Sequence, residues 1–226
     1  MRGLWVVFIV MLTTISWAQE KVTEDYLMAS VGLKYFDQLT PFNDILVDAG
    51  YDPIKKIGLS TSLCYGNQFN QFSIQGRADY NSMTSSEPDD VLLTSYVEVQ
   101  LNVNFAYNLI KSNDRLRLEP GLSLGFAKSS VYMQFLDTTT TFTEILQGQT
   151  STFYTRSKIG FVLTPNVKFS LSSKSVINRA IIMELGHYIS PFELSWQQPD
   201  LGIKRFNGFY FRVGLLINLS RCNSSK

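Results

Sequence analysis

Residues 97–108 alternate between apolar and polar side chains over twelve consecutive positions. The odd positions are all apolar or aromatic, whereas the even positions carry Glu, Gln, Asn, Asn, Ala and Asn. A period of two is the pattern of a β-strand with one apolar and one polar face. The mean strand has only about 5–6 residues, whereas a strand that crosses a membrane needs about 9–11. Length and pattern together therefore favour a transmembrane strand.

The same alternation recurs along the chain. Clear runs cover 116–126, 159–171 and 209–219, and weaker runs cover 27–36, 57–65, 72–80 and 181–189. Pro120 and Pro165 lie within two of these runs, where a local bulge would accommodate the missing N–H donor. Eight strands is an even number and the smallest size of the bacterial outer-membrane barrels. The sequence therefore predicts an all-β fold, an eight-stranded antiparallel up-and-down transmembrane β-barrel.

The connections between these runs provide a second test of this topology. The predicted outer loops cover 37–55, 81–92, 134–151 and 190–207, and the predicted turns cover 66–70, 111–114 and 172–179. Long outer loops that alternate with short periplasmic turns are typical of outer-membrane barrels.

One short helix is predicted within the first outer loop. Thr40 would cap it, Pro41 would occupy its first turn and Gly50 would end it. Phe42, Ile45, Leu46 and Ala49 would share one face. Such a helix either packs over or into one mouth of the barrel or frays on the surface.

The N-terminus predicts export of the chain. Arg2 precedes an uncharged apolar run, and small residues, Ser16 and Ala18, occupy the −3 and −1 positions of a cleavage site. We therefore expect residues 1–18 to be a signal peptide and residues 19–226 to form the barrel domain. A membrane anchor is the alternative, but the apolar run is short of the ~20 residues of a helical span.

Composition agrees with a barrel in contact with lipid. Aromatic residues make up 13% of the chain and charged residues only 17%, against about 25% charged in typical soluble domains. The formal net charge of +1 provides no field that would attract nucleic acid.

The last predicted strand also carries a targeting pattern. Arg212, Gly214, Ile217 and Leu219 follow the spacing polar-x-Gly-x-x-apolar-x-apolar. This spacing resembles the signal that the barrel assembly machinery reads, and it predicts that machinery as a partner and the bacterial outer membrane as the location.

Several segments resemble the small outer-membrane β-barrel families of Bacteroidetes type, which include PorT-like proteins. They are Gln19-Glu20, "FNDILVDAGY" (42–51), "AYNLI" (106–110), "LEPGLSLGF" (118–126) and "FRVGLLINLS" (211–220). The resemblance covers nearly the whole mature chain and implies a barrel without implying an activity. Some relatives support type IX secretion, but no motif in this sequence singles out that role.

Charged side chains on the polar faces of the strands form the main candidate site. The inward-facing set is Lys34, Arg77, Asp79, Glu98, Arg117, Glu119, Lys158, Lys168, Glu184 and Arg212. The interior of an eight-stranded barrel is just wide enough for side chains to fill it, and charges buried there must pair. We therefore expect a salt-bridged lumen that blocks free diffusion, with a proton or small-ion path as the alternative.

Enzymatic motifs are sparse. His187 is the single histidine, so a histidine-cluster metal site is not available. Ser190 follows it, but the two residues have opposite strand parity, and the His-x-Ser pattern of the lipid A deacylases is absent. We expect no catalytic residues, no cofactor and no metal, since neither a nucleotide fingerprint nor a nucleophile elbow is present.

A few loop and cysteine features leave alternatives open. Glu87, Asp89 and Asp90 either bind a divalent ion or form a solvated acidic loop. Cys64 and Cys222 are either free thiols or a disulfide. Phe192 and Trp196 belong either to an aromatic girdle or to a ligand anchor, and Thr138–Thr141 is predicted to be a flexible polar run.

These patterns predict a monomeric outer-membrane barrel with a structural, interaction or envelope-assembly role and no enzymatic activity. The expected partners are outer-membrane lipids, lipopolysaccharide and an envelope or secretion-system protein. One alternative is a periplasmic lipocalin-like barrel that binds an apolar ligand inside. The other is a lipid-modifying outer-membrane enzyme.

Overall fold

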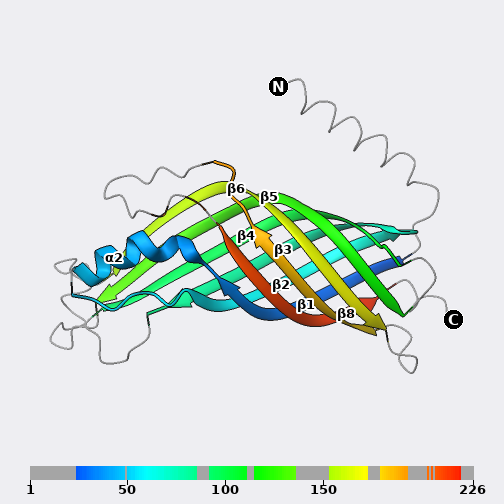
Figure 1. Cartoon of the computed structure of the whole chain (residues 1–226), viewed down its shortest axis with the longest axis horizontal. Helices are drawn as coiled ribbons and strands as arrows, with labels where there is room; N and C mark the ends of the chain where they lie inside the picture. Colours follow the sequence, from blue (N-terminus) through cyan, green and yellow to red (C-terminus); the bar gives the residue numbers. More distant parts are fainter. Residues whose placement is uncertain are drawn as a thin grey trace, which may run out of the picture.

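The structure, a computed structural model, describes residues 24–48, 50–85, 92–110, 115–135, 153–172, 179–192 and 207–219, together with residues 203 and 205. Eight strands form a closed barrel (Figure 1). Their bounds are β1 Glu24–Tyr35, β2 Ile57–Phe69, β3 Phe72–Thr84, β4 Leu92–Tyr107, β5 Leu116–Phe135, β6 Phe153–Ser172, β7 Arg179–Tyr188 and β8 Gly208–Asn218. The predicted signal peptide, residues 1–18, lies outside the described residues.

The strands follow one another around the barrel in sequence order. Every neighbouring pair is antiparallel, and β1 pairs with β8 from Tyr26–Asn218 to Tyr35–Phe209, which closes the sheet. The predicted eight-stranded up-and-down topology is therefore confirmed. None of the described helices is long and apolar enough to span a bilayer.

Alternate side chains separate into an apolar exterior and a polar interior. Leu101, Phe126, Leu185 and Leu215 are each more than half exposed on the outside. By contrast, Lys34, Glu98 and Arg212 are fully buried on the inside. An apolar exterior around a closed sheet is stable in hydrocarbon, where the closed sheet satisfies every ladder hydrogen bond. The chain is therefore an outer-membrane β-barrel, and the soluble lipocalin-like arrangement, apolar inside and polar outside, is contradicted.

The two ends of the barrel differ in the length of their connections. At one end, β2 and β3 are joined by Asn70 and Gln71 alone, and Asn70 has a φ of 56°. We call this the inner end, because short turns face the periplasm in outer-membrane barrels. The opposite end, which carries the helix of the first loop, is called the outer end (Figure 1).

Two details of the predicted connections are wrong. Several strands run further than expected toward the outer end, and β5 and β6 reach 20 residues each. The second outer connection therefore shrinks to residues 85–91, one residue shorter than the inner connection at 108–115. The expectation that every outer loop exceeds every turn fails for this loop.

The two strand prolines do not form bulges, contrary to expectation. The register of β5 with β6 is continuous through Pro120–Val167 and Leu122–Pro165. On the β7 side the ladder stops at Asn166–Gly186 and resumes with a single bridge from Leu163 to Ile189, in the same register. The ring of Pro165 therefore coincides with a gap in the ladder, because proline has no N–H to donate.

The predicted helix is present as α2, Thr40–Asp48, after the short 3-10 helix η1, Asp37–Leu39. Gly50 follows it at a φ of 83°, and its N–H bonds to the carbonyl of Val47, as expected for a helix end. The predicted cap is wrong, because the Thr40 hydroxyl donates backward to the carbonyl of Asp37. Phe42 and Leu46 are buried as predicted, but Asn43 is buried in place of Ile45, which is 47% exposed. Ala49 lies outside the described residues.

Closure of the barrel requires a small residue at Gly214. A Cβ added there would overlap the carbonyl oxygen of Ala29 on β1, whereas a Cβ at Gly76 would meet only the carbonyl oxygen of Tyr65, at 3.9 Å. We expect Gly214→Ala to cost about 1–3 kcal/mol of unfolding free energy, as overpacking does. Gly76→Ala, the matched control, should leave stability unchanged or raise it.

Urea unfolding of the refolded barrel, followed by the gel shift between unboiled and boiled samples, measures this difference. Equal midpoints for the two variants would contradict the packing role of Gly214.

Candidate functional site

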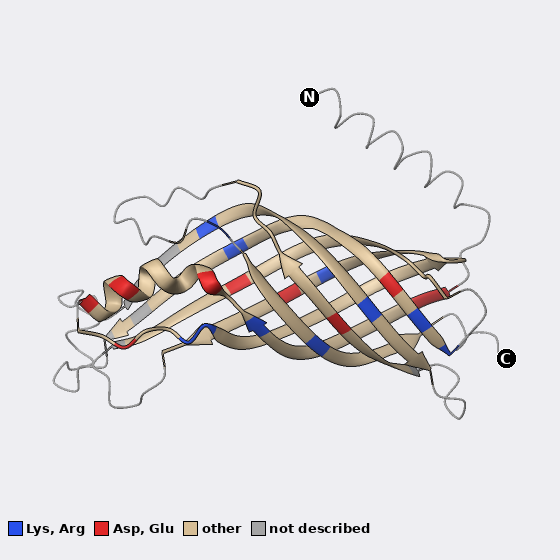
Figure 2. Cartoon of the chain, in the orientation of Figure 1, with Lys and Arg blue, Asp and Glu red and all other residues tan. Residues whose placement is uncertain are grey.

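The candidate site is the lumen, where strand alternation places the polar face of every strand. Eight buried charges from seven strands meet there. They are Lys34 of β1, Arg77 and Asp79 of β3, Glu98 of β4, Glu119 of β5, Lys168 of β6, Glu184 of β7 and Arg212 of β8. Charges of both signs are interspersed along the length of the barrel (Figure 2).

The outermost charge pair joins β1 to β4. The Nζ of Lys34 lies 2.5 Å from Oε1 of Glu98, and both side chains are fully buried. Tyr96 donates its hydroxyl to the other carboxylate oxygen at 2.9 Å, and the amides of Asn81, at 3.2 Å, and Gln100 also donate to Glu98. Lys34 also lies 4.2 Å from the ring centroid of Tyr188. The carboxylate is thus saturated with donors, which offsets its desolvation.

The middle layer joins β3, β7 and β8. Arg212 donates to Asp79 at 2.8 Å, and Arg77 donates to Asp79 at 3.3 Å and to Glu184. The hydroxyl of Tyr210 donates to Glu184 at 2.7 Å. Arg77 therefore bridges Asp79 and Glu184, and Arg212 pairs with Asp79; all four side chains are buried.

Two aromatic rings complete this middle layer. Tyr188 and Tyr210 stack with centroids 4.8 Å apart, and the Arg212 guanidinium lies 4.3 Å from the centroid of Tyr210. Arg212 also donates to the Tyr188 hydroxyl. A guanidinium that lies over an aromatic face gains cation–π attraction in this dry environment.

Neutral side chains link the outer and middle layers. The Ser60 hydroxyl accepts from Nε of Arg212 at 2.8 Å and donates to the side-chain oxygen of Asn81 at 2.6 Å. Asn81 then donates to Glu98. A continuous chain of contacts therefore runs from Lys34 to Glu184, through residues of β1, β2, β3, β4, β7 and β8.

Toward the inner end a separate pair joins β5 to β6. Lys168 lies 2.9 Å from Glu119, and both side chains are almost fully buried. At the rim Arg117 lies 3.1 Å from Glu24, with 22% and 16% of these side chains exposed. Among the described residues, the buried lumen therefore holds four cations and four anions, and each has an ion-pair partner of opposite sign.

An apolar cluster fills the outer mouth. Phe42 and Leu46 of α2 lie in one buried cluster with Met83 of β3, Tyr96 of β4 and Val131 of β5. Other members of this cluster are Phe36, Leu39, Ile54 and Ile203. The Asn43 side chain donates to the carbonyl of Ile54 at 2.9 Å and accepts from its N–H at 3.0 Å, which holds the segment after the helix against α2. Of the two predicted placements, α2 therefore takes the one at the mouth.

The structure brings together most of the residues predicted for the lumen. Lys34, Arg77, Asp79, Glu98, Glu184 and Arg212 belong to the continuous chain of contacts, Glu119 and Lys168 form the lower pair, and Arg117 lies at the rim. Lys158 is half-buried in the outer half of β6. Ser60 and the two stacked tyrosines were not singled out from sequence, although their strand parity already placed them inward. Asn81 was predicted to begin the second outer loop, but β3 extends through it and places it in the lumen.

The residues of the predicted assembly signal do not lie on one face. Arg212 is fully buried in the lumen and bonded to Asp79. Gly214 packs against β1, whereas Ile217 and Leu219 are 37% and 39% exposed on the outside. In the folded barrel Arg212 and Gly214 therefore serve packing and charge pairing.

His187 and Ser190 do not form a pair. The His187 ring stacks on Phe209 with centroids 4.0 Å apart, on the outer face. Ser190 is buried and donates to the carbonyl of Phe192. Their opposite orientation agrees with the strand parity.

The remaining candidates lie partly outside the described residues. Cys64 is a buried free thiol, and Phe192 is 67% exposed. Within the described part of the chain no group of His, Cys, Asp and Glu is placed to hold a metal ion. Cys222, Glu87, Asp89, Asp90, Thr138–Thr141 and Trp196 lie outside the described residues.

Removing one partner of a lumen pair should destabilise the barrel. Glu98→Ala leaves Lys34 buried without its carboxylate, and we expect a loss of about 3–5 kcal/mol of unfolding free energy. The double variant Lys34→Met/Glu98→Leu should recover most of this loss, because it removes both charges. Arg117→Ala, whose partner Glu24 also lies at the partly solvent-exposed inner rim, should lower the unfolding free energy by no more than about 1 kcal/mol.

Urea midpoints of the three variants in detergent provide the comparison. A double variant as unstable as Glu98→Ala would show that an uncompensated charge is not the cause.

Among comparisons with known proteins, only the structural comparison finds matches, and it identifies the fold. No family model matches the sequence, and no curated protein matches it significantly. A major outer membrane protein from Thermus thermophilus is 10% identical with a TM-score of 0.52, over 86% of this chain and 99% of that one. Ail, the attachment invasion locus protein of Yersinia pestis, bound to sucrose octasulfate, is 12% identical with a TM-score of 0.50, over 87% and 100%. Neisserial surface protein A is 10% identical with a TM-score of 0.50, over 86% and 97%. At this identity the likeness shows the fold alone, that of small bacterial outer-membrane β-barrels.

Proposed function

We propose that this protein is a non-catalytic outer-membrane scaffold with a closed lumen, whose outer loops bind envelope components. The balanced charge pairing inside the barrel is the observation that carries this proposal. A pore would need side chains whose charges face water. Here the four buried cations and four buried anions bond to one another.

Two barriers in series support a closed lumen. The middle layer crosses the barrel from β3 to β7 and β8, with Arg77 paired to both Asp79 and Glu184 and Arg212 paired to Asp79. Above it, Phe42 and Leu46 of α2 pack onto Tyr96 and Val131 at the outer mouth. An ion that passes must break buried pairs and cross an apolar layer, and both steps are costly.

The outer surface of α2 supports an interaction role. Ile45 and Val47 are 47% and 55% exposed, one on each flank of the buried face of the helix. Exposed apolar side chains at the outer end are suited to contact a lipopolysaccharide molecule or an envelope or secretion-system protein. The barrel itself needs no second copy, because a closed sheet has no free edge.

A closer family assignment is part of this proposal. The segments around α2 and in strands β5 and β8 resemble PorT-like barrels of Bacteroidetes type, and the spacing of Arg212, Gly214, Ile217 and Leu219 resembles the signal read by the barrel assembly machinery. We propose membership in that group, with the assembly machinery as a transient partner during insertion.

The conductance of the purified barrel tests the closed lumen. We expect no stepwise current from the wild-type protein in planar lipid bilayers. Deletion of residues 40–48 removes the part of the apolar cluster that α2 contributes but keeps the ion pairs, so this variant should also remain closed. The variant Arg77→Ser/Arg212→Ser opens the middle layer and should conduct when combined with the deletion. Regular current steps from the folded wild-type barrel would refute the scaffold proposal.

Substitution of His187 tests the enzymatic alternative. Since this ring stacks on Phe209 and no described serine pairs with it, we expect His187→Ala to leave the acylation pattern of lipid A unchanged. Mass spectra of lipid A from cells that express either form provide the readout. A species present with the wild type and missing with the variant would instead favour a lipid-modifying enzyme.

A further inference from the structure

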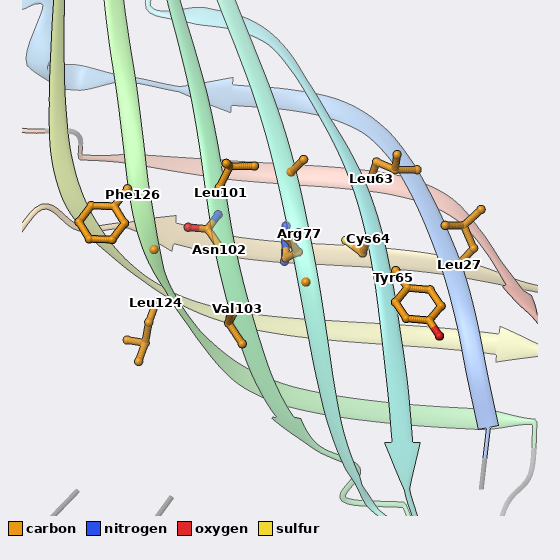
Figure 3. A pocket seen from close by; sticks show the side chains of 13 residues that line it. Leu27, Leu63, Cys64, Tyr65, Arg77, Leu101, Asn102, Val103, Leu124 and Phe126 are labelled. Atoms are coloured by element: carbon orange, nitrogen blue, oxygen red, sulfur yellow. The ribbon is translucent and has the colours of Figure 1, made fainter. Parts of the chain in front are cut away.

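A hollow lies in the membrane-facing surface of the barrel, over β3. Its volume is ≈ 560 Å³. Leu63 and Tyr65 of β2 line one side of β3, and Leu101 and Val103 of β4 line the other (Figure 3). Leu27 of β1 and Leu124 and Phe126 of β5 extend the lining on either side. All these side chains occupy outward positions, whereas Cys64, Arg77 and Asn102, which also border the hollow, are buried on the lumen side of the sheet. The sheet itself therefore separates the hollow from the lumen.

Two small residues of β3 form the floor of this hollow. Gly76 pairs with Tyr65 on one side and Val103 on the other. Ala78 pairs with Leu63 and Leu101 in the same way. Two successive rows across the sheet therefore dip at β3 between large apolar side chains.

The presence of glycine at position 76 has no explanation inside the chain. A Cβ added there would have the carbonyl oxygen of Tyr65, at 3.9 Å, as its nearest neighbour. Every other strand glycine whose surroundings are described would bring its Cβ within 3.0 Å of another atom. Glycine weakens a strand interior, and it often marks a place where a ligand approaches the backbone closely. The glycine therefore leaves the floor open to a molecule outside the chain.

The shape of the hollow favours a hydrocarbon chain as that molecule. Adjacent strands lie about 4.8 Å apart, so the backbones of β2 and β4 are about 10 Å apart, and their side chains narrow the opening further. An α-helix with side chains is about 10–12 Å across and cannot reach the floor. The hollow is also continuous with the apolar belt that already contacts lipid.

The depth of the hollow selects the outer leaflet. The apolar and aromatic outward positions of β3 run from Phe72 near the inner end to Tyr80 toward the outer end, with Gly76 midway between them and Ala78 on the outer side. The polar Ser82 and Thr84 follow at the outer end of the strand. Tyr80 is 42% exposed above this floor. Tyrosine at this level presents a polar tip to the headgroup region and an apolar ring to the chain.

We propose that the hollow over β3 is a binding site for one acyl chain of an outer-leaflet lipid, the lipid A part of lipopolysaccharide. The chain descends past Tyr80 and lies against Ala78 and Gly76, between the side chains of β2 and β4. The site goes beyond the scaffold role, because it uses the membrane-facing surface and neither the lumen nor α2.

Retention of lipid by the purified barrel tests this proposal. The barrel is reconstituted in phosphatidylcholine vesicles with or without lipid A, extracted in mild detergent and examined by native mass spectrometry. We expect the wild type to retain one lipid A molecule after excess lipid is stripped. Gly76→Leu fills the floor and should lower this occupancy about tenfold, the effect of a modest loss of contact energy.

Ala29→Leu is the matched control. Ala29 lies on the outside of β1 and pairs with Leu63, which in turn pairs with Ala78. Ala29 and Ala78 therefore belong to one row across the sheet, but Ala29 does not line the hollow. This variant adds the same type of side chain in the same cross-strand row and should retain lipid A as the wild type does. The gel shift between unboiled and boiled samples verifies folding, and Ala78→Leu replaces Gly76→Leu if the latter does not fold.

Three results would overturn the proposal. The first is equal lipid A occupancy of the wild type and the folded floor-filling variant. The second is equal retention of phosphatidylcholine from vesicles that lack lipid A. The third is a barrel dimer that Gly76→Leu dissociates, since a second copy would then occupy the hollow.

Discussion

Pairing of β1 with β8 is the constraint on which the rest of the structure depends. Ten consecutive residue pairs, from Tyr26–Asn218 to Tyr35–Phe209, close the sheet and leave no free edge within the membrane-spanning part. Closure also determines which side chains meet inside. Arg212 of the last strand reaches Asp79 of β3 and Ser60 of β2 only because the sheet is closed.

The closed sheet separates two environments with opposite demands. Outside, hydrocarbon accepts side chains such as Leu101 and Phe126; inside, a narrow lumen accepts charges only in pairs. A one-residue slip of β8 would exchange its two faces and place Arg212 in lipid. The buried charges therefore penalise the wrong register, whatever their net contribution to stability.

Sequence periodicity predicted this membrane-spanning part well and the outer end less well. The alternation in residues 97–108 and 116–126 survives as the in-and-out pattern of β4 and β5. Their outer extensions escaped prediction because the outer faces there leave the lipid and no longer need apolar residues. The buried face of α2 was misassigned at Asn43 and Ile45, because Asn43 satisfies the backbone of Ile54, a contact that helical periodicity does not contain.

The sequence by itself determined the number of strands, the face that each strand turns to lipid, the end of α2 at Gly50 and the inward orientation of the charges. Each of these follows from a local period or from the φ that a residue allows. Only the tertiary structure decided that Lys34 pairs with Glu98, that Arg77 and Arg212 share Asp79, and that the surface over Gly76 is hollow. These contacts join residues far apart in the chain, and their partners depend on the register and closure of the whole barrel, which no local pattern encodes.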